Sequence, residues 1–132
     1  MAKIQESTEN YLETILVLGL EGSSVRSVDI ASELEYSRAS VSVAMKNLRA
    51  AGYITIDENG YIFLTASGRD IAESMYERHT LLTDWLIFLG VDRNNAVQDA
   101  CRMEHDMSKQ SFDAIRNHIE HFKRDIYHNK SE

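Results

Sequence analysis

The first part of the chain shows helical spacing of its hydrophobic positions. Over residues 4–20 the apolar side chains return every three or four positions, which is the period of an amphipathic helix. They are Tyr11, Leu12, Ile15, Leu16 and Leu18. The spacing predicts a first helix that ends at Gly22.

Two shorter helical patterns follow it, separated by a tight break of two residues. The segment 27–34 predicts a second helix with Ser27 as its N-cap. The third helix is predicted from Ser37, as N-cap, to about Ala51, and Gly52 is placed to end it. The order is helix, turn, helix.

The hydrophobic period then changes from helical to β-type. Residues 54–56 and 61–64 are rich in branched and aromatic side chains, and the segment 57–60 between them ends in Asn59-Gly60. Asn-Gly is a strong signal for a tight hairpin turn. The sequence therefore predicts a two-stranded wing behind the helix-turn-helix.

Helical periodicity returns after the wing and continues to the end of the chain. A long helix is predicted over 65–90, a fifth over 92–106 and a sixth over 108 to about 127. The element order predicts two domains, residues 1–70 as a winged helix-turn-helix and residues 71–132 as an all-α domain.

Composition agrees with a small helical protein. The chain has 132 residues, 43% of them hydrophobic, and no proline. One cysteine excludes an intramolecular disulfide, and we expect a reducing, cytoplasmic location because residues 1–5 carry no secretory leader. No apolar run approaches the roughly 20 residues that cross a bilayer, so no membrane partner is expected.

Charge is distributed unevenly along the chain. The formal net charge of −7, taken alone, argues against a nucleic-acid partner. Residues 36–56, however, contain no acidic side chain and include Arg38, Lys46 and Arg49. This segment is a local positive island on an acidic protein.

The second helix of a helix-turn-helix lies in the major groove of double-stranded DNA, with its N-terminal residues toward the base edges. Here the residues at that position are Ser37, Arg38, Ala39, Ser40 and Ser42. Hydroxyls and an arginine can bind bases or phosphates, and Lys46 would serve phosphate. The alternative is that Ser37 is only an N-cap and the others are solvated surface.

The predicted fifth helix carries a possible metal site. Cys101, Glu104 and His105 are three and four residues apart, so they project from one helical face as thiol, carboxylate and imidazole. His79 on the apolar side of the fourth helix and Glu13 beside the apolar face of the first need a polar partner, which a shared cation would supply. The alternative is that Cys101 is an ordinary core residue.

Several segments together resemble the diphtheria-toxin-repressor family of iron- and manganese-dependent transcriptional regulators. They are residues 9–15, 28–31, 40–42, 64–68, 78–79 and 100–108. The resemblance covers nearly the whole chain, and the stretch from Ala100 to Ser108 is its most specific part.

This resemblance implies a mainly α fold with an N-terminal winged helix-turn-helix followed by an all-α dimerisation domain. It implies a homodimer that represses metal-uptake or metal-homeostasis genes by binding operator DNA when metal is bound. It also implies metal held between the first, fourth and fifth helices. The implied ligands are Asn10, Glu13, His79, Cys101, Glu104 and His105.

The iron and manganese branches of the family differ at two ligand positions, and this sequence matches neither branch at both of them. Cys101 matches the iron branch, since the manganese branch carries glutamate there, whereas Asn10 matches neither methionine nor aspartate. Thr83 and Val97 stand where the iron branch has ancillary ligands. A thiolate favours iron(II), zinc(II) or cobalt(II) over manganese(II). We expect iron(II) first, manganese(II) as close second, and a short form without the SH3-like domain.

Other readings remain open from the sequence. A winged-helix regulator could be independent of metal or sense another ligand, and Cys101 with a histidine could hold structural zinc. Catalysis is not expected, because Cys101 and His105 on one helix lack an evident oxyanion donor. We therefore expect no enzyme and no protein substrate.

Two surfaces of the last helices also have alternative roles. His118, His121 and His128 are either a second metal site or solvated surface, and the latter is preferred because no acidic or thiol partner is evident. An apolar stripe, together with the sixth helix, is either a dimer interface or ordinary core. The stripe consists of Leu82, Trp85, Leu86 and Leu89.

Overall fold

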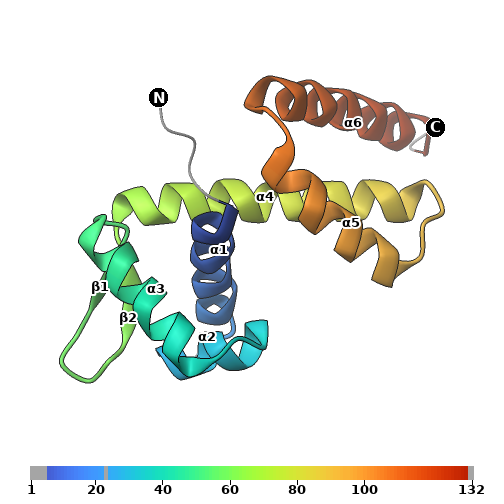
Figure 1. Ribbon diagram of the computed structural model, residues 1–132. Coiled ribbons are helices and arrows are strands. Elements are labelled where there is room, and N and C mark those ends of the chain that lie inside the picture. Colours follow the sequence, from blue (N-terminus) through green and yellow to red (C-terminus); the bar gives the residue numbers. More distant parts are fainter. Residues whose placement is uncertain (1–5, 23, 131–132) are drawn as a thin grey trace. The chain divides into compact units, whose positions relative to one another are not determined.

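The computed structural model describes residues 6–22 and 24–130, with 124–130 as helix backbone. Its contacts divide the chain into two units, the first ending at Tyr76 and the second beginning at Glu77. The described residues form six helices and a two-stranded sheet, which confirms the mainly α winged-helix prediction. The unit boundary and the predicted boundary at residues 70 and 71 both fall inside α4 (Ala66–Phe88) (Figure 1).

Three helices open the first unit: α1 (Glu6–Leu20), α2 (Ser27–Leu34) and α3 (Arg38–Ala50). The predicted start of the first helix at residue 4 lies outside the described residues. Their bounds otherwise follow the prediction closely, because the apolar spacing of each helix faces a common core. α2 packs against α1 and α3.

The caps of these helices confirm one prediction and correct another. Ser37 caps α3, since its hydroxyl accepts the Ser40 backbone N–H at 3.1 Å. The N-cap of α2 is Arg26 and not Ser27, so that prediction is wrong. The physical reason is Asp29, whose carboxylate accepts the Arg26 backbone N–H at 2.9 Å and makes Ser27 the first helical residue.

The core of the first unit is built from all its elements. Leu12 of α1, Ile30 of α2 and Val41 of α3 are fully buried within it, together with Ile54 of the wing. The helical and strand periods therefore converge on one apolar interior, which fixes the face that α3 leaves exposed.

The wing consists of β1 (Ile54–Ile56) and β2 (Ile62–Leu64), paired antiparallel. Its turn is organised by Asp57, whose carboxylate accepts the backbone N–H groups of Asn59 and Tyr61, both at 2.9 Å. Gly60 adopts φ 82, a left-handed conformation that a glycine tolerates without strain. The predicted hairpin is confirmed, with its second strand one residue shorter.

A glycine brings α4 against the base of the wing. Thr65 precedes the helix, and its hydroxyl accepts the Gly68 backbone N–H at 3.2 Å. Gly68 lies so close to the backbone of Tyr53 that a Cβ atom would overlap the Tyr53 carbonyl oxygen. Only glycine permits this approach.

The second unit contains the rest of α4 with α5 (Arg93–Asp106) and α6 (Lys109–Lys130). Asp92 caps α5 by accepting the Asn95 backbone N–H at 3.1 Å. α6 runs to Lys130 and is longer than predicted. None of the helices in the described part of the chain combines the length and apolar character needed to span a membrane.

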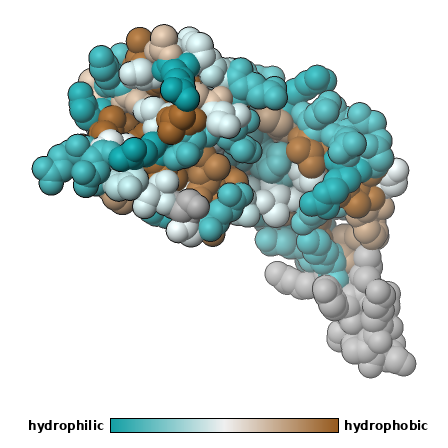
Figure 2. All heavy atoms as spheres, turned by 90° about the horizontal axis from the view of Figure 1, so that it is seen from below, coloured by the Kyte–Doolittle hydropathy of each residue, from teal (hydrophilic) through white to brown (hydrophobic). Residues whose placement is uncertain are grey.

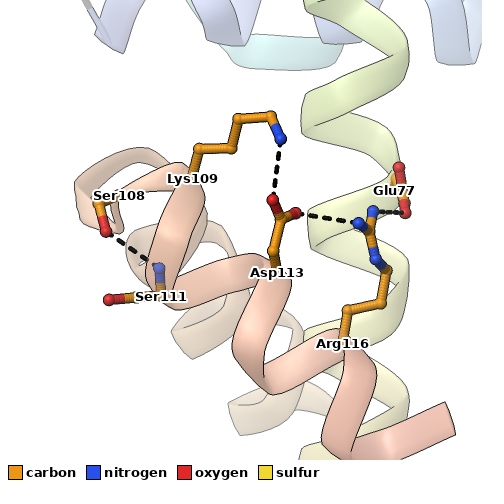
Figure 3. A network of polar contacts seen from close by, with 6 residues as sticks. All are labelled: Glu77, Ser108, Lys109, Ser111, Asp113 and Arg116. Atoms are coloured by element: carbon orange, nitrogen blue, oxygen red, sulfur yellow. Dashed lines mark hydrogen bonds and ion pairs between the residues drawn. The ribbon is translucent and has the colours of Figure 1, made fainter.

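A chain of ion pairs connects α4 and α6 on the surface of this unit (Figure 3). Arg116 lies between two carboxylates, with Glu77 Oε1 at 2.7 Å and Asp113 Oδ1 at 3.0 Å. Lys109 Nζ donates to the other Asp113 oxygen at 2.8 Å. Asp113 therefore joins two cations of α6, and Arg116 carries the connection to α4.

This arrangement makes stability depend on pH. The hydrogen bond from Lys109 is the main cause that lowers the pKa of Asp113 below its usual 3.8, and Arg116 lowers it further. A lowered folded-state pKa stabilises the fold above the unfolded-state pKa, and this contribution is lost as pH falls through the folded-state value. Thermal melting should show Asp113→Asn destabilised at pH 7 and equal to wild type at the lowest pH. An equal difference at both pH values would contradict this role.

Candidate metal centre and nucleic-acid interface

Three predicted ligands converge on one face of α5 in the second unit. Cys101, Glu104 and His105 each offer a ligand atom, and these atoms lie within 4.8 Å of one another. Glu104 and His105 are buried and Cys101 is half-buried. The helical spacing of the sequence thus produces the expected cluster of thiol, carboxylate and imidazole.

Glu104 is the centre of this cluster. Its side chain is fully buried, and Oε2 lies 3.1 Å from Nδ1 of His79 on α4. Oε1 lies 3.4 Å from Nε2 of His105, yet accepts no hydrogen bond from any residue described. A buried carboxylate oxygen without a donor costs free energy, which a cation would remove. The donor set therefore fits a divalent transition metal.

A neighbouring arginine, which is not among the predicted site residues, fixes the end of α5. Arg78 is buried, and its Nη1 donates to the backbone carbonyls of Glu104 at 2.9 Å and Met107 at 2.7 Å. Its guanidinium carbon lies 5.2 Å from the centre of the Phe112 ring. The available signal was a charged residue next to His79 on an otherwise apolar helical face.

Asn10 and Glu13 lie on α1 in the first unit. Glu13 is buried and Asn10 is half-buried, with the Asn10 backbone carbonyl accepting the Thr14 hydroxyl at 2.8 Å. Their position one helical turn apart is that of a pair on one face. Their roles as ligands stay predictions.

Within the described residues, neither the positions of the iron branch's ancillary ligands nor the histidines of α6 form a further metal cluster. Thr83 is buried and Val97 half-buried, and neither offers a metal-binding histidine, thiol or carboxylate. His118 and His121 are exposed and belong to no group of converging ligands in the part of the chain described. The side chain of His128 lies outside the described residues.

The candidate nucleic-acid interface is the exposed side of α3 and the wing. The predicted contact residues are all exposed, whereas Val41, Met45 and Leu48 face the core. The contact residues are Ser37, Arg38, Ala39, Ser40, Ser42 and Lys46. In Figure 2 the wing tip projects at the left edge as polar side chains, in keeping with the exposed Asp57, Glu58 and Asn59.

Two family models match consecutive parts of the chain. Residues 3–61 match the N-terminal DNA-binding domain of the iron-dependent repressors. Residues 65–131 match their metal-binding and dimerisation domain. Together the two matches include nearly all of the structure described above.

Individual relatives agree with these matches. The chain is 36% identical over 112 residues to the transcriptional regulator MntR of Escherichia coli O6:H1, covering 85% of this chain and 72% of the relative. It is 32% identical over 117 residues to the regulator MntR of Shouchella clausii, covering 89% and 82%.

A solved structure of a manganese-dependent transcriptional repressor in complex with manganese has the same fold. Its TM-score is 0.75 at 26% identity, with 82% of this chain and 50% of that chain covered. This chain therefore spans half the length of that repressor. The family matches, the winged helix and the buried ligand cluster support one assignment. The chain belongs to the iron-dependent repressor family, also called the diphtheria-toxin-repressor and manganese-regulator family, whose members are metal-dependent transcriptional repressors and not enzymes.

Proposed function

We propose that this chain is a homodimeric repressor that binds operator DNA when a divalent metal occupies the Glu104 centre, with iron(II) preferred over manganese(II). Its targets would be genes of metal uptake or homeostasis, and its place of action the cytoplasm. The observation that carries the proposal is the buried Glu104 Oε1, without a hydrogen-bond donor among the described residues and adjacent to Cys101 and His105.

The donor set supports the preference for iron(II). A bound cation would supply positive charge to a buried carboxylate and a thiolate at once. Cys101 provides a soft sulfur ligand where a manganese site is better served by oxygen. Glu104 and the imidazoles of His79 and His105 suit iron(II) as well as manganese(II).

The proposal includes Asn10 and Glu13 as ligands from the first unit, as the family resemblance implies. Ligands drawn from both units would make metal binding favour conformers in which those ligands converge. DNA affinity and metal affinity would then increase each other by the same factor.

An apolar groove in the second unit supports the homodimer. It has a volume of about 320 Å³ and lies between α4 and α6, lined in part by Trp85, Leu89 and Phe122. Leu89 of the predicted stripe is exposed by 59%, and its neighbour Phe88 by 62%, whereas Leu82 of the stripe is fully buried. The stripe therefore divides into a core part and an exposed part, and the exposed part is the proposed contact with a second copy.

The testing experiment measures DNA binding across metals under anaerobic conditions. Double-stranded fragments are selected from a random pool in iron(II), manganese(II), zinc(II) or chelator, and their affinity is then measured by gel shift. We expect selection and tight binding with iron(II), weaker stimulation by manganese(II), and none with chelator. Equal affinity in metal and chelator would favour a metal-independent regulator with a structural cluster instead.

Two variants separate the metal site from the DNA site in the same assay. Cys101→Glu should reverse the order of iron(II) and manganese(II), because a carboxylate replaces the thiolate. Arg38→Ala should weaken DNA binding while calorimetric metal titration stays unchanged. Arg102→Ala, which removes an exposed cation of α5, is the matched control for lost charge. An unchanged metal order for Cys101→Glu would remove Cys101 from the site.

A further inference from the structure

The side chain of Arg26 connects the start of α2 with the turn of the wing. Its Nη2 donates to the backbone carbonyl of Asn59 at 2.6 Å. Its guanidinium carbon lies 4.7 Å from the centre of the Tyr61 ring, in cation–π range. One exposed side chain therefore contacts both halves of the wing turn.

The turn end of β2 is attached to the same segment through the backbone. The Ile62 N–H donates to the carbonyl of Val25 at 2.8 Å. The turn end of the wing is thus bound to residues 25 and 26 by two hydrogen bonds, one from the Ile62 backbone to Val25 and one from the Arg26 side chain to Asn59. Only the second bond depends on a side chain, so substitution can remove it without changing the backbone.

The backbone of Arg26 is itself fixed by α2. As N-cap, it donates its N–H to Asp29 Oδ2 at 2.9 Å, and its carbonyl accepts the Asp29 N–H at 3.0 Å. Because α2 packs against α3, the anchor point of the wing turn is fixed relative to the exposed face of α3.

The wing turn is acidic, so its approach to DNA depends on how it is positioned. Asp57 and Glu58 are exposed, and the turn itself carries no cation over residues 57–61. Such a turn is not drawn to phosphate by its own charge. Its approach to DNA depends on where its backbone is held, and Arg26 is the side chain that holds it.

We propose that Arg26 is a positioning residue for DNA binding, which holds the wing turn at the start of α2 so that the wing and α3 meet the same DNA site. The inference rests on the DNA-binding function proposed above. It assigns to Arg26 a role through Asn59 and Tyr61 and not through contact with phosphate.

The first test measures hydrogen exchange in the free protein, without DNA. Arg26→Ala should speed exchange of the Gly60 and Tyr61 amides by roughly 5- to 10-fold, because one hydrogen bond and one cation–π contact are lost. Amides in the middle of α3 should exchange as in wild type, which excludes general destabilisation. Unchanged exchange in the turn would overturn the proposal, whether or not the chain binds DNA.

The second test measures affinity for the selected DNA and its dependence on salt. Arg26→Ala and Tyr61→Leu should each lower affinity by roughly 3- to 10-fold, and the double variant should lose little more than either alone. Tyr61→Phe keeps the ring and should bind as wild type does. The slope of log affinity against log salt should stay unchanged in Arg26→Ala, since a lost phosphate contact reduces it by about 0.9.

The two tests distinguish the possible failures. If wild type selects no DNA while the turn still loosens in Arg26→Ala, the proposed function fails and the wing contact stands. A reduced salt slope with full additivity between positions 26 and 61 would instead make Arg26 a phosphate contact and overturn the positioning role. Arg102→Ala, an equal loss of charge in the other unit, controls for net charge.

Discussion

Replacing Glu104 by glutamine is expected to abolish metal-stimulated DNA binding and to lower metal affinity by at least about 100-fold. Substitutions in the shell that supports metal ligands already cost about 10- to 100-fold, and Glu104 lies at the centre of the proposed ligand set. Calorimetric titration with iron(II) under anaerobic conditions measures the affinity, and gel shift measures the stimulation.

The same substitution should raise the stability of the metal-free protein. An amide carries no charge, so the cost of burying a carboxylate with an oxygen that has no donor among the described residues falls, and stability should rise by about 1–3 kcal/mol. Wild type should gain about 2.7 kcal/mol from metal at 100 times Kd, and the variant should gain none at that concentration. Urea denaturation with and without metal measures both differences.

Asp99→Asn is the matched control, because Asp99 is an exposed carboxylate on the same helix. It should leave metal affinity and both stabilities within about 0.5 kcal/mol of wild type. A Glu104→Gln protein that retained metal stimulation would show that the carboxylate serves only the packing of α4 against α5.

Replacing Gly68 by alanine is expected to destabilise the first unit by about 3 kcal/mol or more. The added methyl group would overlap the Tyr53 carbonyl oxygen, which belongs to the backbone and cannot move as a side chain does. The Thr65 backbone N–H donates to that same oxygen at 3.0 Å, so a displacement also strains the start of α4. Urea denaturation followed by circular dichroism measures the loss.

Gly19→Ala is the control for this change. Gly19 also lies in a helix, but a Cβ there would meet no atom within 4 Å. Alanine is the better helix former, so this variant should match wild type or gain up to about 1 kcal/mol. If both substitutions changed the free energy of unfolding equally, the close approach of Gly68 to the wing would not contribute to stability.

The elements of this fold could be predicted because each has a local signal. Ser37 combines a cap residue with a following apolar period, and Asn59-Gly60 separates two runs of branched residues. The cap of α2 was mispredicted because two residues compete there. Ser27 is the better cap by residue type, yet Asp29 reaches back to Arg26, which a residue preference alone does not reveal.

The candidate metal site also has a part that the sequence predicts and a part that it does not. Cys101, Glu104 and His105 are brought together by one helix, so their convergence follows from spacing. The contact of His79 with Glu104 requires α4 and α5 to pack in one register, which the apolar pattern suggested without fixing. Arg78 and Arg26 donate hydrogen bonds to backbone carbonyls. Every residue has a backbone carbonyl, so the amino-acid sequence does not show which ones accept these bonds.

The two hydrogen bonds from Arg78 to the end of α5 are made between protein groups alone, so they form before any ion arrives. The last turn of α5 is therefore pre-ordered, with Glu104 already in contact with His79 and with His105 beside Glu104. A cation entering this centre would not have to fold its own ligands. Its binding free energy would remain available for coupling to DNA, in contrast to small zinc domains that fold only around their metal.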